Sequence, residues 1–264
     1  MSSPEEGAPG TTTAWVWRLA AAIAVALPAL PILAAILITS GQVNAARRAS
    51  TFVPAQTRGG SSSLPAGSGA LVAVLIHATE LRSAPAGRAL AAVALKTNFG
   101  SPNAMWVVDQ SPGWLGVISP LAGNGRIGWI PQAAVSLTRV PLELRVSLSA
   151  HKLTVLESGR VVQQYTVAVG RPDAPTPTGR FDVTDRLLTG DPSGPYGCCI
   201  LALSAIAPHA ISDWTGGDRV AIHSTTETSS IGLSVTHGCV RVTLAHGRWL
   251  LSHVPLGTPT LITA

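Results

Sequence analysis

Short apolar runs broken by glycine and proline constrain this chain more than any other feature. Its 264 residues include 26 glycines and 20 prolines. Between residues 70 and 140 the runs LVAVLI, MWVV, WLGVI and GWIP are separated by turn-forming residues, and no helical period lasts three full turns. This pattern is typical of short strands joined by tight turns, so we predict a mainly β fold.

A long apolar run near the N-terminus departs from this pattern. LAAAIAVALPALPILAAILIT, at residues 19–39, is about as long as a helix that crosses a bilayer. Trp15 and Trp17 lie at its start, where interfacial anchors are common. We predict a membrane span over residues 15–40, as an uncleaved signal anchor. A signal peptide cleaved after Val43-Asn44-Ala45 is the alternative.

The remaining N-terminal half divides by composition. We predict that residues 1–14 are disordered and that residues 41–69, with RGGSSSLPAGSG, form a flexible linker. Residues 70–140 include GWLGVISPLAGNGRIGWIPQAAV, which resembles the end of a bacterial SH3-like barrel. The resemblance implies a small β-barrel. We predict that Trp106, Trp114 and Trp129 lie in its core, and a role in stacking on a ligand is the alternative.

Residues 141–264 are predicted to form a second, β-rich domain. LELRVSLS, KLTVLES and RVVQQYTVAVG alternate apolar and polar residues, as half-buried strands do. Glu157-Ser158-Gly159 is a plausible hairpin turn. Thr243 can cap one helix from Leu244 to about Val254, which Pro255 would end.

The chain has three cysteines: Cys198, Cys199 and Cys239. Adjacent cysteines rarely bond to each other because the ring is strained, so we expect Cys198 and Cys199 to be unpaired strand residues. Redox control of Cys239 by this pair is the less favoured alternative. An odd count leaves at least one thiol free in an exported protein.

Cys239 follows Thr236-His237-Gly238, and His223 lies sixteen residues before it. A histidine can take the proton of a neighbouring thiol, which predicts thiolate character at Cys239. Gly238 permits a tight turn whose amides could face an oxyanion. Spacing alone leaves two interpretations open: acyl transfer through a thioester, or a buried structural cysteine near two histidines.

The segment Ile222-His223-Ser224 followed by THGCVR, residues 236–241, resembles the signature of the YkuD family of L,D-transpeptidase catalytic domains. Upstream, a strand–hairpin–strand pattern followed by TPTG at residues 176–179 resembles the opening of the same domain. The resemblance covers about residues 142–264 with its motifs in the family's order.

The resemblance implies specific roles. Cys239 would be the nucleophile and His223 the general base and acid. The carbonyl of Ser224 would orient His223, and His237 would shape the site.

The same resemblance assigns the turn before the nucleophile. The amides of Gly238 and Cys239 would form the oxyanion hole, within a loop that Thr236 begins. Arg241 would hold a substrate carboxylate or brace the loop through a structural ion pair.

The implied partners are peptidoglycan stem peptides. The donor tetrapeptide would lose its D-Ala, and an amine on another stem would then form a 3→3 cross-link without metal or cofactor. An L,D-carboxypeptidase would use water instead of the amine. The sequence also admits a zinc hydrolase that uses His223, His237 and Cys239, and a non-catalytic wall-binding protein.

The charge pattern points to no polyanionic partner. The net charge of +5 is modest and no basic run of five residues occurs, so we expect a solvated surface and no nucleic-acid binding. Oligomeric state stays open.

The distribution of basic residues and the implied cell-wall chemistry predict opposite membrane orientations for the chain. Arg47 and Arg48 follow the predicted span and only Arg18 precedes it, which alone would place the C-terminus in the cytoplasm. The implied wall chemistry requires the opposite. We therefore expect a cell-membrane protein with its catalytic domain on the extracytoplasmic side.

Overall fold

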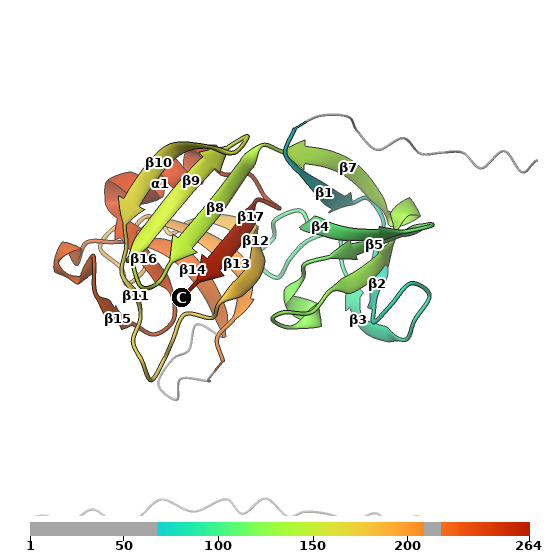
Figure 1. The fold of residues 1–264 in the computed structure, drawn as a ribbon, viewed down its shortest axis with the longest axis horizontal. Coiled ribbons are helices and arrows are strands. Elements are labelled where there is room, and N and C mark those ends of the chain that lie inside the picture. The colour runs from blue at the N-terminus through green and yellow to red at the C-terminus, as the bar shows by residue number, and fades with distance from the viewer. Residues whose placement is uncertain (1–67, 209–217) are drawn as a thin grey trace, which may run out of the picture. The chain divides into compact units, whose positions relative to one another are not determined.

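The computed structural model describes residues 68–208 and 218–264, all within one compact unit, Gly60–Ala264. Two large β-sheets, one two-stranded sheet and one α-helix make up this part (Figure 1). The predicted membrane span over residues 15–40 and the predicted disordered N-terminus lie outside the described residues, as does almost all of the predicted linker. Within the described ranges, no helix is long and apolar enough to cross a bilayer.

The first sheet has seven strands in the order β3-β2-β6-β5-β4-β1-β7. These strands are β1 (Ala70–Leu75), β2 (Thr79–Arg82), β3 (Ala89–Val93), β4 (Ala104–Ser111), β5 (Trp114–Val117), β6 (Gly128–Pro131) and β7 (Val135–Val140). Short 3-10 turns cover η1 (Pro120–Ala122) and η2 (Gln132–Ala134). The sheet encloses an apolar cluster that includes Leu81, Leu115 and Ile130. The SH3-like resemblance of this region stays a prediction.

The predicted tryptophan core of this sheet is wrong. Trp106, Trp114 and Trp129 are only partly buried, and aliphatic side chains fill the core instead. On β4, Met105 and Val107 point inward, so strand alternation directs Trp106 outward.

The second sheet has eight strands in the order β10-β9-β8-β17-β12-β13-β14-β16. They are β8 (Leu142–Ser147), β9 (Lys152–Glu157), β10 (Arg160–Thr166), β12 (Gly179–Leu188), β13 (Cys199–Ile206), β14 (Arg219–Thr225), β16 (Val240–Thr243) and β17 (Pro259–Thr263). Most neighbours are antiparallel, but β8 with β17 and β14 with β16 are parallel. A separate parallel pair joins β11 (Val169–Gly170) to β15 (Ser234–Thr236), and η3 (Thr228–Ser230) precedes β15.

Two local predictions for this domain are confirmed. Ser158 and Gly159 have φ values of 49° and 80°, and they turn the chain from β9 into β10. Helix α1 spans Leu244–His253, and the side chain of Thr243 caps it by accepting a hydrogen bond from the His246 N–H.

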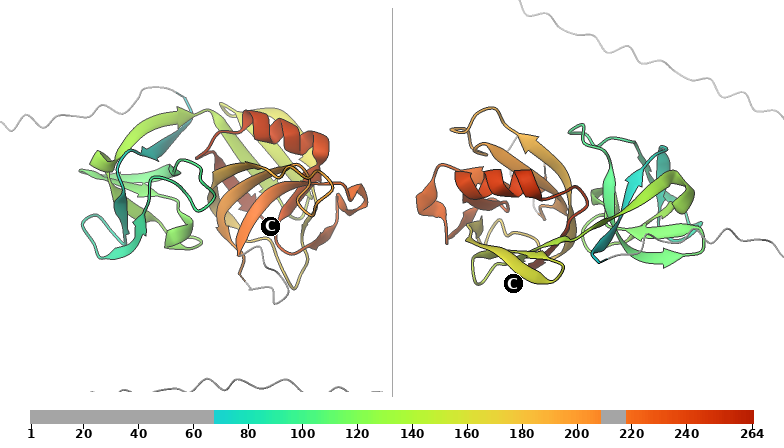
Figure 2. Two further views of the ribbon diagram at one scale, coloured as in Figure 1. Left: turned by 180° about the vertical axis from the view of Figure 1, so that it is seen from behind. Right: turned by 90° about the horizontal axis from the view of Figure 1, so that it is seen from above.

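Helix α1 packs against β13, β14 and β16, and Figure 2 shows it lying across this end of the sheet. Gly247 allows the close approach, because a Cβ there would lie 2.7 Å from the Cβ of Ser224 on β14. The helix therefore supports the strand that carries the predicted base.

Candidate active site

Cys239 lies at the point where the chain enters β16. Gly238 before it has a φ of 109°, a conformation that side chains rarely adopt. Thr236 closes the turn: its hydroxyl donates to the Cys239 carbonyl at 2.6 Å and accepts from the Gly238 N–H at 3.2 Å. Cys239 is partly buried and is the one free cysteine of the chain. The odd thiol expected from the cysteine count is therefore the predicted nucleophile.

His223 lies in the middle of β14 and is only 4% exposed. Its Nδ1 lies 3.0 Å from the backbone carbonyl of Ser224, so Nδ1 carries the proton of the neutral ring and Nε2 keeps the lone pair. His223 pairs in register with Arg241 on β16, two residues beyond Cys239. The sheet thus brings together the predicted base, Ser224, Arg241 and the strand that directly follows Cys239.

Burial decides the protonation of both groups. The pKa of His223 falls to about 4, mainly because the ring is buried. The charge of Arg241 also lowers it, whereas hydrogen bonds to the backbone of Ser224 and Tyr196 raise it. Burial also raises the pKa of Cys239, although the Ala221 backbone and Arg241 act in the opposite direction. The predicted thiolate–imidazolium pair is therefore wrong for the resting site, where a neutral thiol and a neutral imidazole are favoured at pH 7.

Tyr196 is a site residue that sequence reasoning missed. Its ring lies edge-on to His223 with centroids 5.0 Å apart. Burial, and then the nearby Cys239, raise the pKa of Tyr196 to about 12. Tyr196 therefore borders both predicted catalytic groups. The turn sequence Gly194-Pro195-Tyr196-Gly197 is the signal that could have drawn attention to it.

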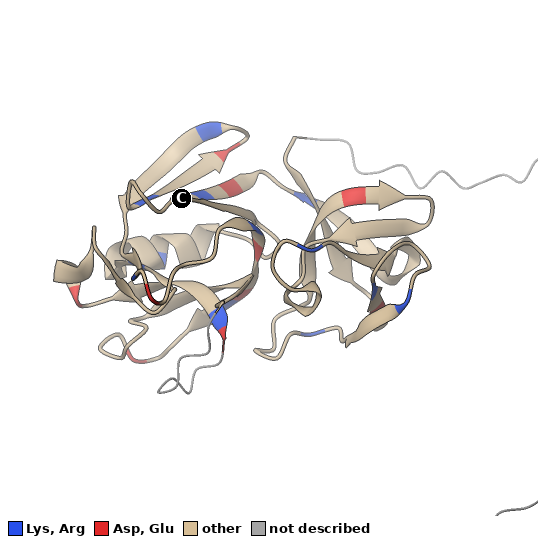
Figure 3. Ribbon diagram, turned by 60° about the horizontal axis from the view of Figure 1, so that its bottom comes forward, with Lys and Arg blue, Asp and Glu red and all other residues tan. Residues whose placement is uncertain are grey.

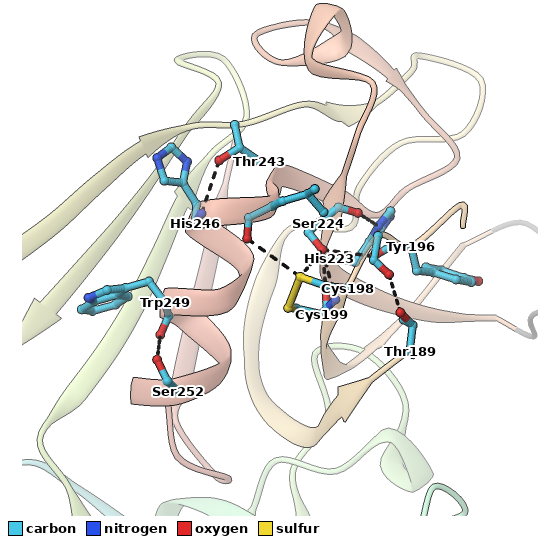
Figure 4. The surroundings of a disulfide bond; sticks show 12 residues. Thr189, Tyr196, Cys198, Cys199, His223, Ser224, Thr243, His246, Trp249 and Ser252 are labelled. Carbon is cyan, nitrogen blue, oxygen red and sulfur yellow. Dashed lines mark hydrogen bonds between the residues drawn. A yellow bond between two sulfur atoms is a disulfide. The ribbon is translucent and has the colours of Figure 1, made fainter. Parts of the chain in front are cut away.

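Ser224 connects this turn to the base (Figure 4). Its hydroxyl accepts from the Cys199 N–H at 3.1 Å and donates to the Tyr196 carbonyl at 3.3 Å. Gly197 has a φ of 57°, and a Cβ there would lie 2.5 Å from the Ser224 hydroxyl oxygen. The predicted role of Ser224 as an orienting residue thus has a structural basis on both its backbone and its side chain.

Cys198 and Cys199 form a disulfide bond with each other, so the prediction that they are unpaired is wrong. Both are buried, and the Cys198 sulfur lies 3.4 Å from the Ser224 hydroxyl (Figure 4). Only Cys199 belongs to β13. Cys198 still belongs to the preceding turn, so the strand rule that sends consecutive side chains to opposite faces does not separate the two sulfurs.

His237 is exposed, and Arg171, which directly follows β11, contacts its ring. Arg171 Nη1 lies 2.8 Å from His237 Nε2. Arginine can only donate, so Nε2 accepts and the proton of the neutral ring is on Nδ1. The Arg171 N–H also donates to the Thr236 carbonyl at 3.0 Å. Arg171 is a second residue that sequence reasoning missed, because 66 residues separate it from its partner.

Arg241 pairs with Glu227, whose Oε2 lies 3.0 Å from Nη1. Glu227 belongs to the segment between β14 and β15, so this pair braces the loop before the nucleophile. Of the two roles predicted for Arg241, the structure contains the ion pair.

The Gly238 amide departs from its predicted place in the oxyanion hole. The Gly238 N–H donates to Thr236 Oγ1 within the turn, so in this conformation it is not free to donate to an oxyanion. The Cys239 amide is the other predicted donor.

Charge is mixed over both sheets, as the interspersed blue and red segments in Figure 3 show. In residues 68–208 and 218–264, no three His, Cys, Asp or Glu side chains are grouped as a metal site would require.

The comparisons with known proteins agree with the site. Residues 142–262 match the family described as the L,D-transpeptidase catalytic domain, YkuD. The YkuD protein of Bacillus licheniformis is 35% identical over 124 residues, which cover 47% of this chain and 67% of that protein. The chain belongs to the YkuD family of L,D-transpeptidase catalytic domains.

Two further relatives support this membership. The YkuD protein of Bacillus subtilis strain 168 is 34% identical over 123 residues, covering 47% of this chain and 66% of that protein. L,D-transpeptidase 1 of Mycobacterium tuberculosis is 30% identical over 124 residues, covering 43% of this chain and 47% of that protein. Both YkuD-family motifs predicted from the sequence lie inside the matched residues 142–262.

Proposed function

We propose that this protein is a peptidoglycan L,D-transpeptidase that forms 3→3 cross-links through a thioester on Cys239. The observation that carries the proposal is a buried histidine held through Nδ1 by the Ser224 carbonyl, on the strand that pairs with β16 directly after the single free thiol. Family membership supplies the substrate class.

The first step acylates Cys239. The sulfur attacks the carbonyl carbon of the third stem residue while His223 Nε2 takes the thiol proton. The C–S bond forms, the C–N bond to D-Ala breaks, and His223 returns the proton to the leaving amine. The Cys239 amide would stabilise the oxyanion.

The second step releases the acyl group. An amine of another stem loses its proton to His223 and attacks the thioester, and the Cys239 sulfur leaves with a proton from His223. A neutral Cys239 thiol and a neutral His223 suit this route, because the thiol proton moves to His223 during the attack and no thiolate–imidazolium pair has to form first.

We also propose that the catalytic domain lies on the extracytoplasmic side of the cell membrane, anchored through residues 15–40. The Cys198–Cys199 disulfide supports an oxidising compartment, since cytosolic thiols are kept reduced. Alkaline phosphatase fused after Ala264 should be active, and an inactive, stably expressed fusion would contradict this topology.

Intact-mass spectrometry of the full-length chain with a disaccharide-tetrapeptide tests the mechanism. The wild type should show a transient acyl adduct and release D-Ala, and Cys239→Ala should show neither. A cross-linked dimer identifies a transpeptidase, whereas a tripeptide alone identifies a carboxypeptidase. If folded wild type forms neither adduct nor product, a non-catalytic wall-binding role replaces this proposal.

A further inference from the structure

Arg171 has a charged side chain at the nucleophile's turn that the proposed chemistry does not yet use. It lies directly after β11, and its backbone N–H is bonded to the Thr236 carbonyl. The segment after it folds back closely, since a Cβ on Gly170 would lie 2.4 Å from the Thr176 nitrogen. The Thr176 hydroxyl also accepts from the Gly170 N–H at 2.9 Å. The backbone therefore fixes Arg171 beside the turn that presents Cys239.

The guanidinium is held from two sides and is still accessible. Nη1 contacts His237 Nε2 at 2.8 Å, and Nε lies 2.8 Å from the Asp173 carboxylate. That second contact lacks the alignment of a hydrogen bond. The side chain of Arg171 is 39% exposed and that of Asp173 is 72% exposed. A half-exposed arginine whose carboxylate partner Asp173 is itself mostly exposed to solvent keeps donors for an incoming anion.

The site's other arginine is less suited to this role. Arg241 is 21% exposed, and its Nη1 already donates to Glu227. Arg171 is therefore the more accessible cation next to the nucleophile's turn.

We propose that Arg171 binds a carboxylate of the donor stem peptide and so selects donors that carry one. This inference rests on the proposed function for the identity of the donor. The bond that would be cleaved precedes the last residue of the donor, so a terminal carboxylate enters the site with every productive substrate. A planar guanidinium is the side chain best shaped to bind it through two N–H groups.

Two carboxylates of the donor have this chemistry. One is the C-terminal carboxylate of the leaving residue, and the other is the side-chain carboxylate of a diamino diacid at the third position. Donors with either group converted to the amide distinguish them.

The test is calorimetric binding of these donors to the full-length chain carrying Cys239→Ala, which cannot form the adduct. Adding Arg171→Gln should raise the Kd of the unmodified donor about tenfold, the loss of one exposed charge-assisted contact. Adding Asp173→Asn should lower that Kd, because it removes the carboxylate that competes for the guanidinium. Arg145→Gln is the matched control: Arg145 also pairs with an acid two residues away, Glu143, but lies on β8, and its removal should leave the Kd unchanged.

The amide donor whose Kd no longer responds to Arg171→Gln identifies the carboxylate that Arg171 binds. Equal weakening of all donors would show that Arg171 only supports His237, and an unchanged Kd would show no contact; either result overturns the inference. Arg171→Lys should recover part of the affinity, which separates loss of charge from misfolding. Binding is measured without turnover, so failure of the wild type to release D-Ala would contradict the proposed function and leave this result standing.

Discussion

The two sheets differ in what they bury. The first sheet, residues 70–140, packs an almost wholly apolar cluster, and Ser119 is its only buried polar residue within the described ranges. The second sheet buries His223, Ser224, Asp182 and Asp185 among further serines and threonines. Burying a polar group is costly unless it is bonded, so proteins retain such groups where they serve a purpose. The difference indicates that the first sheet contributes stability and the second contains the chemistry.

The largest expected effect is on activity, at the base. His223→Gln should lower kcat/KM about 10²- to 10⁴-fold, because both steps of the proposed reaction move the proton through the Nε2 of His223. The free energy of unfolding should change little, and steady-state D-Ala release with urea unfolding measures both. His253→Gln, an exposed histidine on α1, is the control. If His223→Gln keeps its activity, His223 is not the general base and the second sheet does not supply one.

A cavity in the first sheet should have the reverse effect. Leu115→Ala removes a fully buried side chain and should lower the free energy of unfolding by about 2–5 kcal/mol. The kcat of the protein that stays folded should be unchanged. Urea denaturation and activity at low temperature measure the two quantities. A large fall in kcat without loss of stability would mean that the first sheet takes part in catalysis.

The pH at which activity falls on the acid side tests the lowered pKa of His223. The pKa of His223 is about 4, so the base stays neutral down to that pH. At pH 5 an ordinary histidine would be only about 3% neutral, a roughly thirtyfold loss that this enzyme should not show. The measurement is kcat/KM from pH 3.5 to 8. A limb near 6.5 would mean that water enters the site in solution.

Asp182 on β12 is a buried acid with no role in the proposed reaction. It therefore tests how burial of a charged group affects stability alone. Its Oδ2 accepts from the Trp106 N–H at 2.8 Å, and Oδ1 has no partner. Burial raises the pKa of Asp182 to about 7, although the Trp106, Ser204 and Arg219 contacts lower it. A folded pKa above the unfolded value means that stability present at low pH is lost as pH rises from about 4 through 7.

Asp182→Asn should therefore gain stability relative to the wild type as pH rises. The difference in unfolding free energy should be near zero at pH 4 and grow by about 1 kcal/mol or more by pH 8. His223 titrates in both proteins and cancels in the difference. Urea denaturation at four pH values measures it, and a pH-independent difference would contradict the raised pKa.

The smallest effect is expected at the disulfide. Alkylation of the denatured, unreduced chain should modify one cysteine, and prior reduction should raise the count to three. Reduction in a Cys239→Ala background should lower the free energy of unfolding by only about 1 kcal/mol, because so short a loop restricts the unfolded chain little. Three thiols without reduction would show that Cys198 and Cys199 are unpaired.

Local chemistry explains why some elements were predictable. Ser158-Gly159 and the Thr243 cap depend on neighbours within four residues, and their predicted positions are confirmed. The three tryptophans were misplaced because the resemblance to a barrel does not reveal which face of each strand turns inward. The pairing of Cys198 with Cys199 was missed because the turn that ends at Gly197 overrides the geometry of a regular strand.

The sequence by itself determined the family, the nucleophile candidate and the histidine. THGC and the His223 strand are short, contiguous motifs, so they can be identified without knowing how the chain folds around them. Only the tertiary structure decided the protonation of Cys239 and His223, the contact of Arg171 with His237, and the bond of the Gly238 amide within its turn. Burial and contacts between distant segments set a pKa or orient a ring, and both arise only when strands far apart in the chain are packed together.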